Sequence, residues 1–138
     1  MDPRRRLLRA GLGLFLLGLV TGFAVPAMTN PRAGLAAHLE GLLNGMFLMV
    51  VGLAWHELRL SATAGRAISW LLLFGTHANW VATTASAVLG TSRGTPIAGA
   101  GFQAAPVVEW SVYGLLALVG ITMLLACGGL VAGAWRSR

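Results

Sequence analysis

Four long apolar runs divide this chain and leave few folds open to it. They cover about residues 7–28, 34–55, 66–89 and 107–135. As a helix, the first run would measure about 33 Å, close to the roughly 30 Å thickness of a bilayer core. A membrane β-strand needs only about ten residues of alternating character, so the runs are not barrel strands. We therefore predict an all-α fold: an integral membrane four-helix antiparallel bundle, forming a single transmembrane domain over residues 1–138.

The balance of residue types agrees with a membrane protein. Hydrophobic residues make up 57% of the chain and charged residues only 10%, whereas soluble domains carry about 25% charged residues. The arginine-rich start followed by an apolar run resembles a signal peptide. However, this run is long enough to span the bilayer, and no small-residue cleavage site stands out. We expect it to be retained as the first helix.

The positive charges are distributed unevenly between the two sides of the predicted bundle. The formal net charge is +6, and every cation is an arginine. Eight arginines lie on the side of the termini and two, Arg32 and Arg93, in the opposite links, which predicts that both termini are cytoplasmic. The arginines lie at the ends of apolar runs and form no basic stripe, so we expect no nucleic-acid partner. The eight are Arg4, Arg5, Arg6, Arg9, Arg59, Arg66, Arg136 and Arg138.

Polar residues of three helices are predicted to gather in one half of the bilayer. Asn44 lies ten residues from the Gly34 end of the second run, and Asn79 lies ten residues from the Leu89 end of the third. Antiparallel helices place both ends on one side, so both amides should lie about 15 Å deep. His38 and Thr83 lie nearer that surface, and Glu109 and Tyr113 of the fourth run complete the layer. Polar groups inside a membrane span indicate a functional site.

Each of these residues also has a purely structural interpretation. Either asparagine can simply form a hydrogen bond to a neighbouring helix, which contributes about 1 kcal/mol to helix association. Glu40 and Glu109 can pair with Arg32 or Arg93 at the interface, an interpretation we favour for Glu109. The small residues that recur every four positions fit close helix packing as well as contact with a flat ligand. These small residues are Ala37, Gly41 and Gly45.

Histidine raises the question of a cofactor. His38 lies one turn into an apolar helix, beside the small-residue stripe, and neutral imidazole is a common axial ligand of haem iron. His77, in the third run, is either a packed histidine or a second ligand, as in a bis-histidine electron carrier. No phosphate loop, paired cysteine, zinc motif or serine elbow is present in the sequence.

The second run resembles a known family of enzymes. The pattern Asn30-Pro31-Arg32-x-Gly-Leu-x-Ala-His38-Leu-Glu-Gly-x-Leu-Asn44-Gly-Met resembles the hydroxylaminobenzene mutases, small membrane proteins that isomerise hydroxylaminobenzene to 2-aminophenol. More distantly, the stretch from His38 to Met46 is similar to styrene oxide isomerase. That enzyme is a trimeric four-helix membrane protein with haem b between subunits. A histidine is its axial ligand, and the iron acts as a Lewis acid.

The resemblance implies roles for individual residues. His38 would ligate the iron of haem b, with Gly41 and Gly45 beside the macrocycle and with Arg32 and Arg93 pairing with its propionates. Asn44 and Asn79 would orient the substrate. The styrene oxide isomerase pattern has an aspartate and a tyrosine where this chain has Gly75 and Thr83, which fits a different substrate. Tyr113 is our candidate for the missing phenol, and Glu40 is a further catalytic candidate.

We therefore expect a membrane isomerase of arylhydroxylamines that uses haem b. A small aromatic substrate would enter from the lipid bilayer, and the protein would form a homo-oligomer, with a homotrimer favoured, in a bacterial inner membrane. The alternatives are a bis-histidine electron carrier using His38 and His77, and a non-catalytic membrane subunit. If no haem is bound, an acid-catalysed isomerase using Glu40 stays open. The long link 90–106 is a candidate lid.

Overall fold

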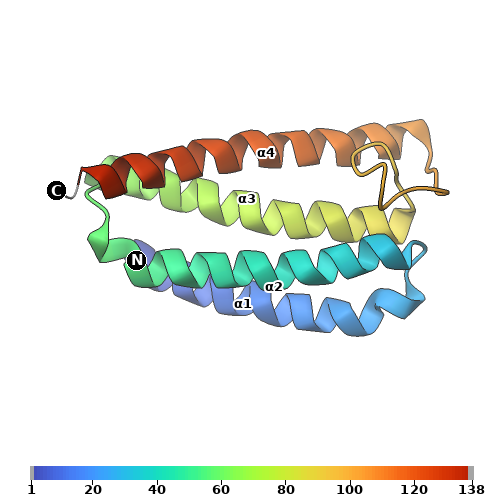
Figure 1. The fold of residues 1–138 in the computed structure, drawn as a ribbon, viewed down its shortest axis with the longest axis horizontal. Helices are drawn as coiled ribbons and strands as arrows, with labels where there is room; N and C mark the ends of the chain where they lie inside the picture. Colours follow the sequence, from blue (N-terminus) through green and yellow to red (C-terminus); the bar gives the residue numbers. More distant parts are fainter. Residues whose placement is uncertain (1, 137–138) are drawn as a thin grey trace.

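The computed structural model describes residues 2–136, and within that part of the chain it contains four long helices and no strand (Figure 1). The helices run antiparallel, so the two ends of the described chain lie at one end of the bundle. This confirms the predicted fold class. The elements are α1 (Pro3–Ala24), η1 (Val25–Ala27), α2 (Pro31–Leu53), η2 (Ala54–Glu57), α3 (Ala62–Leu89) and α4 (Pro106–Trp135).

Two helices begin about four residues before the apolar runs that predicted them. The side chain of Asp2 accepts a hydrogen bond from Arg4 N at 3.2 Å, and Pro3 fills the first helical position of α1. At α3, the Ser61 hydroxyl caps Ala64 N at 3.2 Å. Capping residues set where a helix begins, whereas hydropathy marks only the part that lies in the lipid. The polar first turns are therefore helical too.

The first two helices are in backbone contact. A Cβ atom at Gly41 of α2 would lie 2.4 Å from Gly18 Cα of α1. One turn along, a Cβ atom at Gly45 would lie 2.8 Å from Gly11 O. Only glycine allows this approach, because any side chain would collide with the facing backbone. Close packing of small residues is how helices associate in a membrane. The remaining helices pack in chain order, α3 on α2 and α4 on α3.

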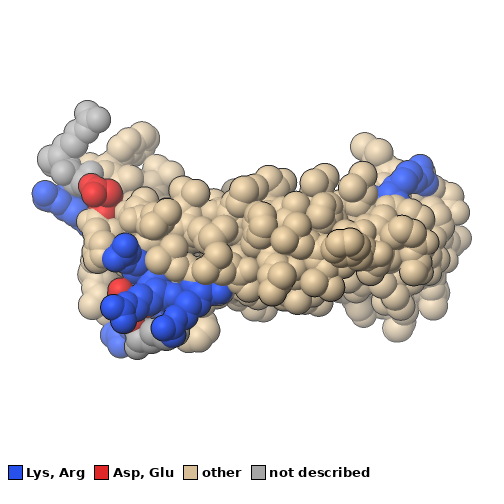
Figure 2. Space-filling model, turned by 90° about the horizontal axis from the view of Figure 1, so that it is seen from below, with Lys and Arg blue, Asp and Glu red and all other residues tan. Residues whose placement is uncertain are grey.

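Three of the helical segments are long and apolar enough to cross a membrane: Pro3–Ala27, Pro31–Glu57 and Pro106–Trp135. α3 is of similar length, with 28 residues, but it carries more polar side chains along its length. On the face seen in Figure 2 no charged residue appears in the middle, while arginines gather at the end that holds the termini and appear again at the far end. This distribution is that of a membrane protein. Arg138, counted in the charge prediction, lies outside the described residues.

The link between α3 and α4 is fastened to the helix ends. The buried Glu109 carboxylate accepts hydrogen bonds from the backbone N–H groups of Ser92 at 3.1 Å, Arg93 at 2.8 Å and Ala104 at 3.0 Å. We favoured a pairing of Glu109 with Arg32 or Arg93 at the interface. The structure brings Glu109 to Arg93, which the carboxylate meets through the Arg93 backbone N–H and by coulombic attraction. Glu109 also binds the backbone N–H groups of Ser92 and Ala104, so it holds both ends of the link and lies apart from the polar residues of α2 and α3.

The middle of the same link is held from the start of α2. Asn30, fully buried, donates its side-chain amide to Ala98 O at 2.8 Å and caps α2 by accepting from Ala33 N at 3.2 Å. The Arg32 guanidinium donates to Ala100 O. Glu109, Asn30 and Arg32 thus hold the link over this end of the bundle, and these contacts do not favour a mobile lid.

Candidate functional site

His38 lies where α2 passes closest to the second half of α1. Its Nδ1 atom is 2.8 Å from Gly18 O, the main-chain carbonyl that the close packing of α1 leaves within reach. A carbonyl accepts, so the ring donates Nδ1–H and carries its lone pair on Nε2. Within the described chain no hydrogen bond reaches Nε2. The histidine is thus held in one tautomer, with a free basic nitrogen.

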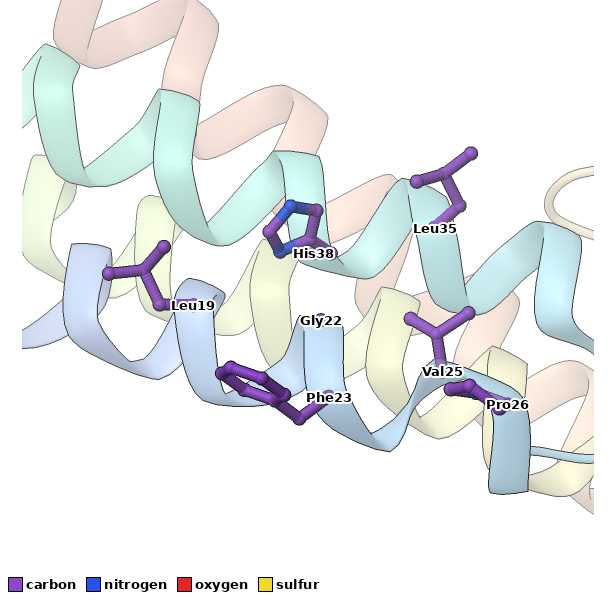
Figure 3. A pocket seen from close by; sticks show the side chains of 7 residues that line it. All are labelled: Leu19, Gly22, Phe23, Val25, Pro26, Leu35 and His38. Carbon is purple, nitrogen blue, oxygen red and sulfur yellow. The ribbon is translucent and has the colours of Figure 1, made fainter.

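An apolar hollow of about 450 Å³ adjoins the imidazole (Figure 3). Its lining comes only from α1, η1 and α2, and consists of Leu19, Gly22, Phe23, Val25, Pro26, Leu35 and His38. The volume lies in the range of about 300–1,000 Å³ that is usual for ligand pockets. Because the hollow opens on the outside of the bundle, a ligand here would also face lipid or a neighbouring protein.

Gly22 makes the room for the imidazole. A Cβ atom at this position would lie 2.8 Å from His38 Nδ1 and 3.0 Å from its Cε1. Neither Gly22 nor Gly18 was predicted from the sequence. The signal was available, since the two glycines are four residues apart in the first apolar run and would lie on one helix face.

The predicted contact of Gly41 and Gly45 with a flat cofactor does not fit their positions. Both are buried against the α1 backbone, at Gly18 and at Gly11, which leaves no space for a ligand. The structure therefore corrects that assignment in favour of helix packing, the alternative that the spacing had left open. The stripe still serves the site, because it brings the Gly18 carbonyl to His38.

A second polar group forms between α2 and α3. Glu40 Oε2 accepts a hydrogen bond from Asn79 Nδ2 at 2.5 Å and another from Asn44 Nδ2 at 3.1 Å. The prediction that the two amides lie at one depth is thus confirmed, and their meeting point is a carboxylate. Within the described chain no hydrogen bond reaches Glu40 Oε1. All three side chains are half-buried.

His38 and the Glu40 group lie on different sides of α2. Helical residues advance by about 100° each, so two positions two residues apart point about 200° apart. The contacts agree, since His38 meets α1 while Glu40 meets α3. In one chain, therefore, the free imidazole nitrogen and the free carboxylate oxygen do not face the same space.

Three other predicted site residues lie outside both groups. Tyr113 is 43% exposed and packs edge-on against Trp110, with ring centroids 5.7 Å apart. The Arg93 guanidinium lies 4.1 Å from the centroid of Trp110. Arg32 lies 5.9 Å from the ring centroid of Phe102 and binds the link. The predicted roles of the two arginines toward haem carboxylates and of Tyr113 in catalysis stay predictions.

His77 belongs to a different part of the surface. Its Nδ1 is 2.8 Å from Leu73 O, and it adjoins a hollow bordered by Ala10 of α1. His38 adjoins a different hollow, which is lined by α1, η1 and α2. The structure therefore places the two histidines at separate hollows, and the bis-histidine pair stays a prediction.

The structure shows how Gly75 and Thr83, the two residues that depart from the styrene oxide isomerase pattern, are packed. Gly75 is buried where α3 meets α4, and a Cβ atom there would lie 2.5 Å from Met123 Sδ. An aspartate would therefore not fit without displacing Met123. Thr83 is buried and donates its hydroxyl to Asn79 O at 2.9 Å, so it supports the backbone beside Asn79.

Taken together, the fold and the site define a helical membrane protein with two intramembrane polar sites, one around a histidine and one around a carboxylate. The family model of styrene oxide isomerase matches residues 3–135, and the chain belongs to this family.

Two relatives narrow the assignment within the family. Hydroxylaminobenzene mutase HabB of Ectopseudomonas oleovorans is 45% identical over 124 residues, which cover 89% of this chain and 76% of the relative. Hydroxylaminobenzene mutase HabA of the same organism is 44% identical over 111 residues, covering 80% and 82%. The chain is therefore a membrane isomerase. No solved structure matches it.

Proposed function

We propose that this chain converts hydroxylaminobenzene-type arylhydroxylamines to 2-aminophenols. The observation that carries this proposal is the Glu40 carboxylate, held by two asparagine amides inside the membrane, in a chain whose relatives are named hydroxylaminobenzene mutases. In the reaction the N–O bond breaks and a C–O bond forms at the ortho carbon. The proton of that carbon is lost and the nitrogen gains one, so no net oxidation occurs.

The chain's own residues fit the proton transfer. Asn44 and Asn79 occupy Oε2 of Glu40 and thereby fix the carboxylate, which leaves Oε1 to accept the ring proton. The carboxyl group then holds this proton until the nitrogen takes it, as a general acid–base does. The amide oxygens of both asparagines have no partner within the described chain, so they are available to accept the substrate's N–H and O–H groups. In a dry site such hydrogen bonds are stronger than in water.

Haem b is the cofactor we propose, and the surroundings of His38 fit it. The Nδ1–H of a metal-bound histidine is usually donated to a carbonyl or carboxylate, which fixes the tautomer, and here Gly18 O is that acceptor. The lone pair on Nε2 and the apolar hollow suit an iron macrocycle. When bound, haem iron would supply a Lewis acid that weakens the N–O bond.

The opposite orientation of His38 and Glu40 supports a homo-oligomer. Both can act on one substrate only if the His38 hollow of one copy faces the Glu40 group of another. A closed ring of such heterologous contacts has a cyclic symmetry, and the family resemblance favours a trimer. We further propose a bacterial inner membrane with the arginine-rich end in the cytoplasm, following the bias of positive charge.

The test is to purify the protein in detergent, record its absorption spectrum and incubate it with hydroxylaminobenzene. We expect a Soret band and formation of 2-aminophenol. His38→Ala should lose both, while the control His77→Ala should keep the Soret band. Glu40→Gln should keep the Soret band and lose turnover.

Each failure has a distinct meaning. A Soret band unchanged in His38→Ala would remove His38 as the ligand. Turnover without any chromophore would remove haem and leave acid catalysis by Glu40. A Soret band lost equally in His77→Ala, without turnover, would favour the electron carrier. No turnover of any arylhydroxylamine by a folded protein would overturn the proposed reaction.

A further inference from the structure

The arginine-rich end of the bundle contains a small cation–aromatic group between α1 and α3. The Arg6 guanidinium lies 4.4 Å from the ring centroid of Trp70 and donates to the Ser69 hydroxyl. Arg6 Nε is buried and has no hydrogen-bond partner. Arg66, exposed one turn before Trp70, lies on the same face of α3. A concentrated positive charge is therefore fixed at the point where the helices leave the charged end.

Directly beside this group lies an apolar hollow of about 430 Å³, bordered by Ala10, Trp70, Leu73, Phe74 and His77. Trp70 belongs to both features, because Arg6 stacks on its ring while the same ring borders the hollow. From Trp70 to His77 the hollow follows α3 for about 10 Å, toward the middle of the bundle. Charge at the end of the span and an apolar channel leading inward are thus continuous.

The geometry points to a binding site for an anionic phospholipid on the α1–α3 face. The phosphate would bind at Arg6 and Arg66, and an acyl chain would lie in the hollow from Trp70 to His77. Basic pockets between membrane helices bind anionic headgroups in this way, and arginine matches phosphate through its planar fork of donors. This site is separate from the proposed reaction, which uses other faces of the bundle.

The charges favour a lipid over the other occupants. Copies in one membrane share an orientation, so a second copy seated on this face would bring its own arginine-rich end against Arg6 and Arg66. By the helix bounds, seven described arginines and only two described acidic residues, Asp2 and Glu57, lie at that end. A neutral aromatic substrate would leave the guanidinium charge uncompensated. An anionic headgroup with an apolar tail satisfies both halves of the site.

The experiment titrates detergent-purified, full-length protein with phosphatidylglycerol, phosphatidylcholine or inorganic phosphate and counts bound molecules by native mass spectrometry. Each arginine near an anionic surface contributes enough that its loss should weaken phosphatidylglycerol binding at least about fivefold. Arg6→Gln should show this loss. Arg136→Gln removes one charge from the same end but outside the groove, and should bind within about twofold of the parent. Trp70→Leu, at an exposed position, should weaken binding too and serves as the test variant if Arg6→Gln does not fold.

The outcomes separate the alternatives. Tight phosphatidylglycerol binding that depends on Arg6 and Trp70 but not on Arg136 supports the site. Equal losses in Arg6→Gln and Arg136→Gln would mean diffuse attraction by total charge and overturn it. So would equal affinity for phosphatidylcholine, or phosphate binding as strongly as the lipid. A smaller oligomer in Arg6→Gln, with lipid binding unchanged, would assign the face to contact between copies instead.

Discussion

The contact between Gly22 and His38 allows a sharp test of whether the position of the imidazole matters for turnover. In Gly22→Ala the new methyl group would lie 2.8 Å from Nδ1, whereas ordinary contacts begin at 3.4 Å. The α1 backbone cannot move, because Gly18 is already pressed against α2. The ring must therefore shift by about 0.6 Å relative to the Gly18 carbonyl that orients it.

Two magnitudes follow from this shift. A misplacement of about 1 Å at a reacting centre can cost about 100-fold in rate, so 0.6 Å predicts a loss of about 10- to 20-fold. Stability should change little. Weakening the Nδ1 hydrogen bond costs about 1 kcal/mol, while replacing a helical glycine by alanine contributes about 1 kcal/mol of helix propensity. The variant should thus be folded but slow.

The assay is the initial rate of 2-aminophenol formation by detergent-purified protein, with the unfolding temperature measured in parallel. Gly13→Ala is the matched control, because no atom lies within 4 Å of a Cβ at this position of the same helix. It should keep the parent rate. If Gly22→Ala is as fast as the parent while His38→Ala is inactive, imidazole placement does not limit the reaction and the reasoning fails.

Three further predictions concern the carboxylates and the α3–α4 contact. Asn79→Ala should lower kcat about tenfold, because Glu40 loses the shorter of its two hydrogen bonds, a charged bond contributing about 1.5–3 kcal/mol. Steady-state kinetics measure it, and a change confined to KM would contradict it. Glu109→Gln should make the 92–104 link sensitive to limited proteolysis, since an amide NH₂ cannot accept the backbone N–H groups that the carboxylate binds; unchanged cleavage would contradict the anchor. Gly75→Ala should destabilise the protein by about 1–3 kcal/mol through overpacking against Met123 Sδ, and the shorter side chain of Met123→Ala should restore the unfolding temperature.

The helices and the depth of the polar residues could be predicted from the sequence because both depend on position along an axis. Apolar length fixes how far a helix spans, and counting residues from a helix end fixes depth. Asn44 and Asn79 meet at Glu40 for this reason. The same reasoning placed Tyr113 at a similar depth, where depth alone could not show that its ring packs beside Trp110.

The rotation of each helix about its own axis, and the partner that each polar side chain binds, were harder to predict. The spacing of Gly41 and Gly45 fits both helix packing and ligand contact, and only the α1 glycines opposite them decide between the two. Arg93 and Glu109 are close in space, but the carboxylate binds the main chain of the link and the guanidinium stacks on Trp110. Backbone donors of a loop carry no sequence signature, so no motif could have predicted that Glu109 binds the main chain of the link.

The most specific stretch of the sequence, His38 to Asn44, thus serves two different surfaces. A motif read along the chain suggests one site, because its members are within six residues of each other. On a helix, residues two apart point to different sides, and here the imidazole meets α1 while the carboxylate and its amides meet α3. If both groups serve one reaction, the sequence of α2 encodes two complementary halves of a site that copies of the chain must bring together. Selection on a single helix would then tune catalysis and assembly at once, which ties the proposed oligomer to the chemistry: a variant that keeps both side chains but prevents association should be inactive.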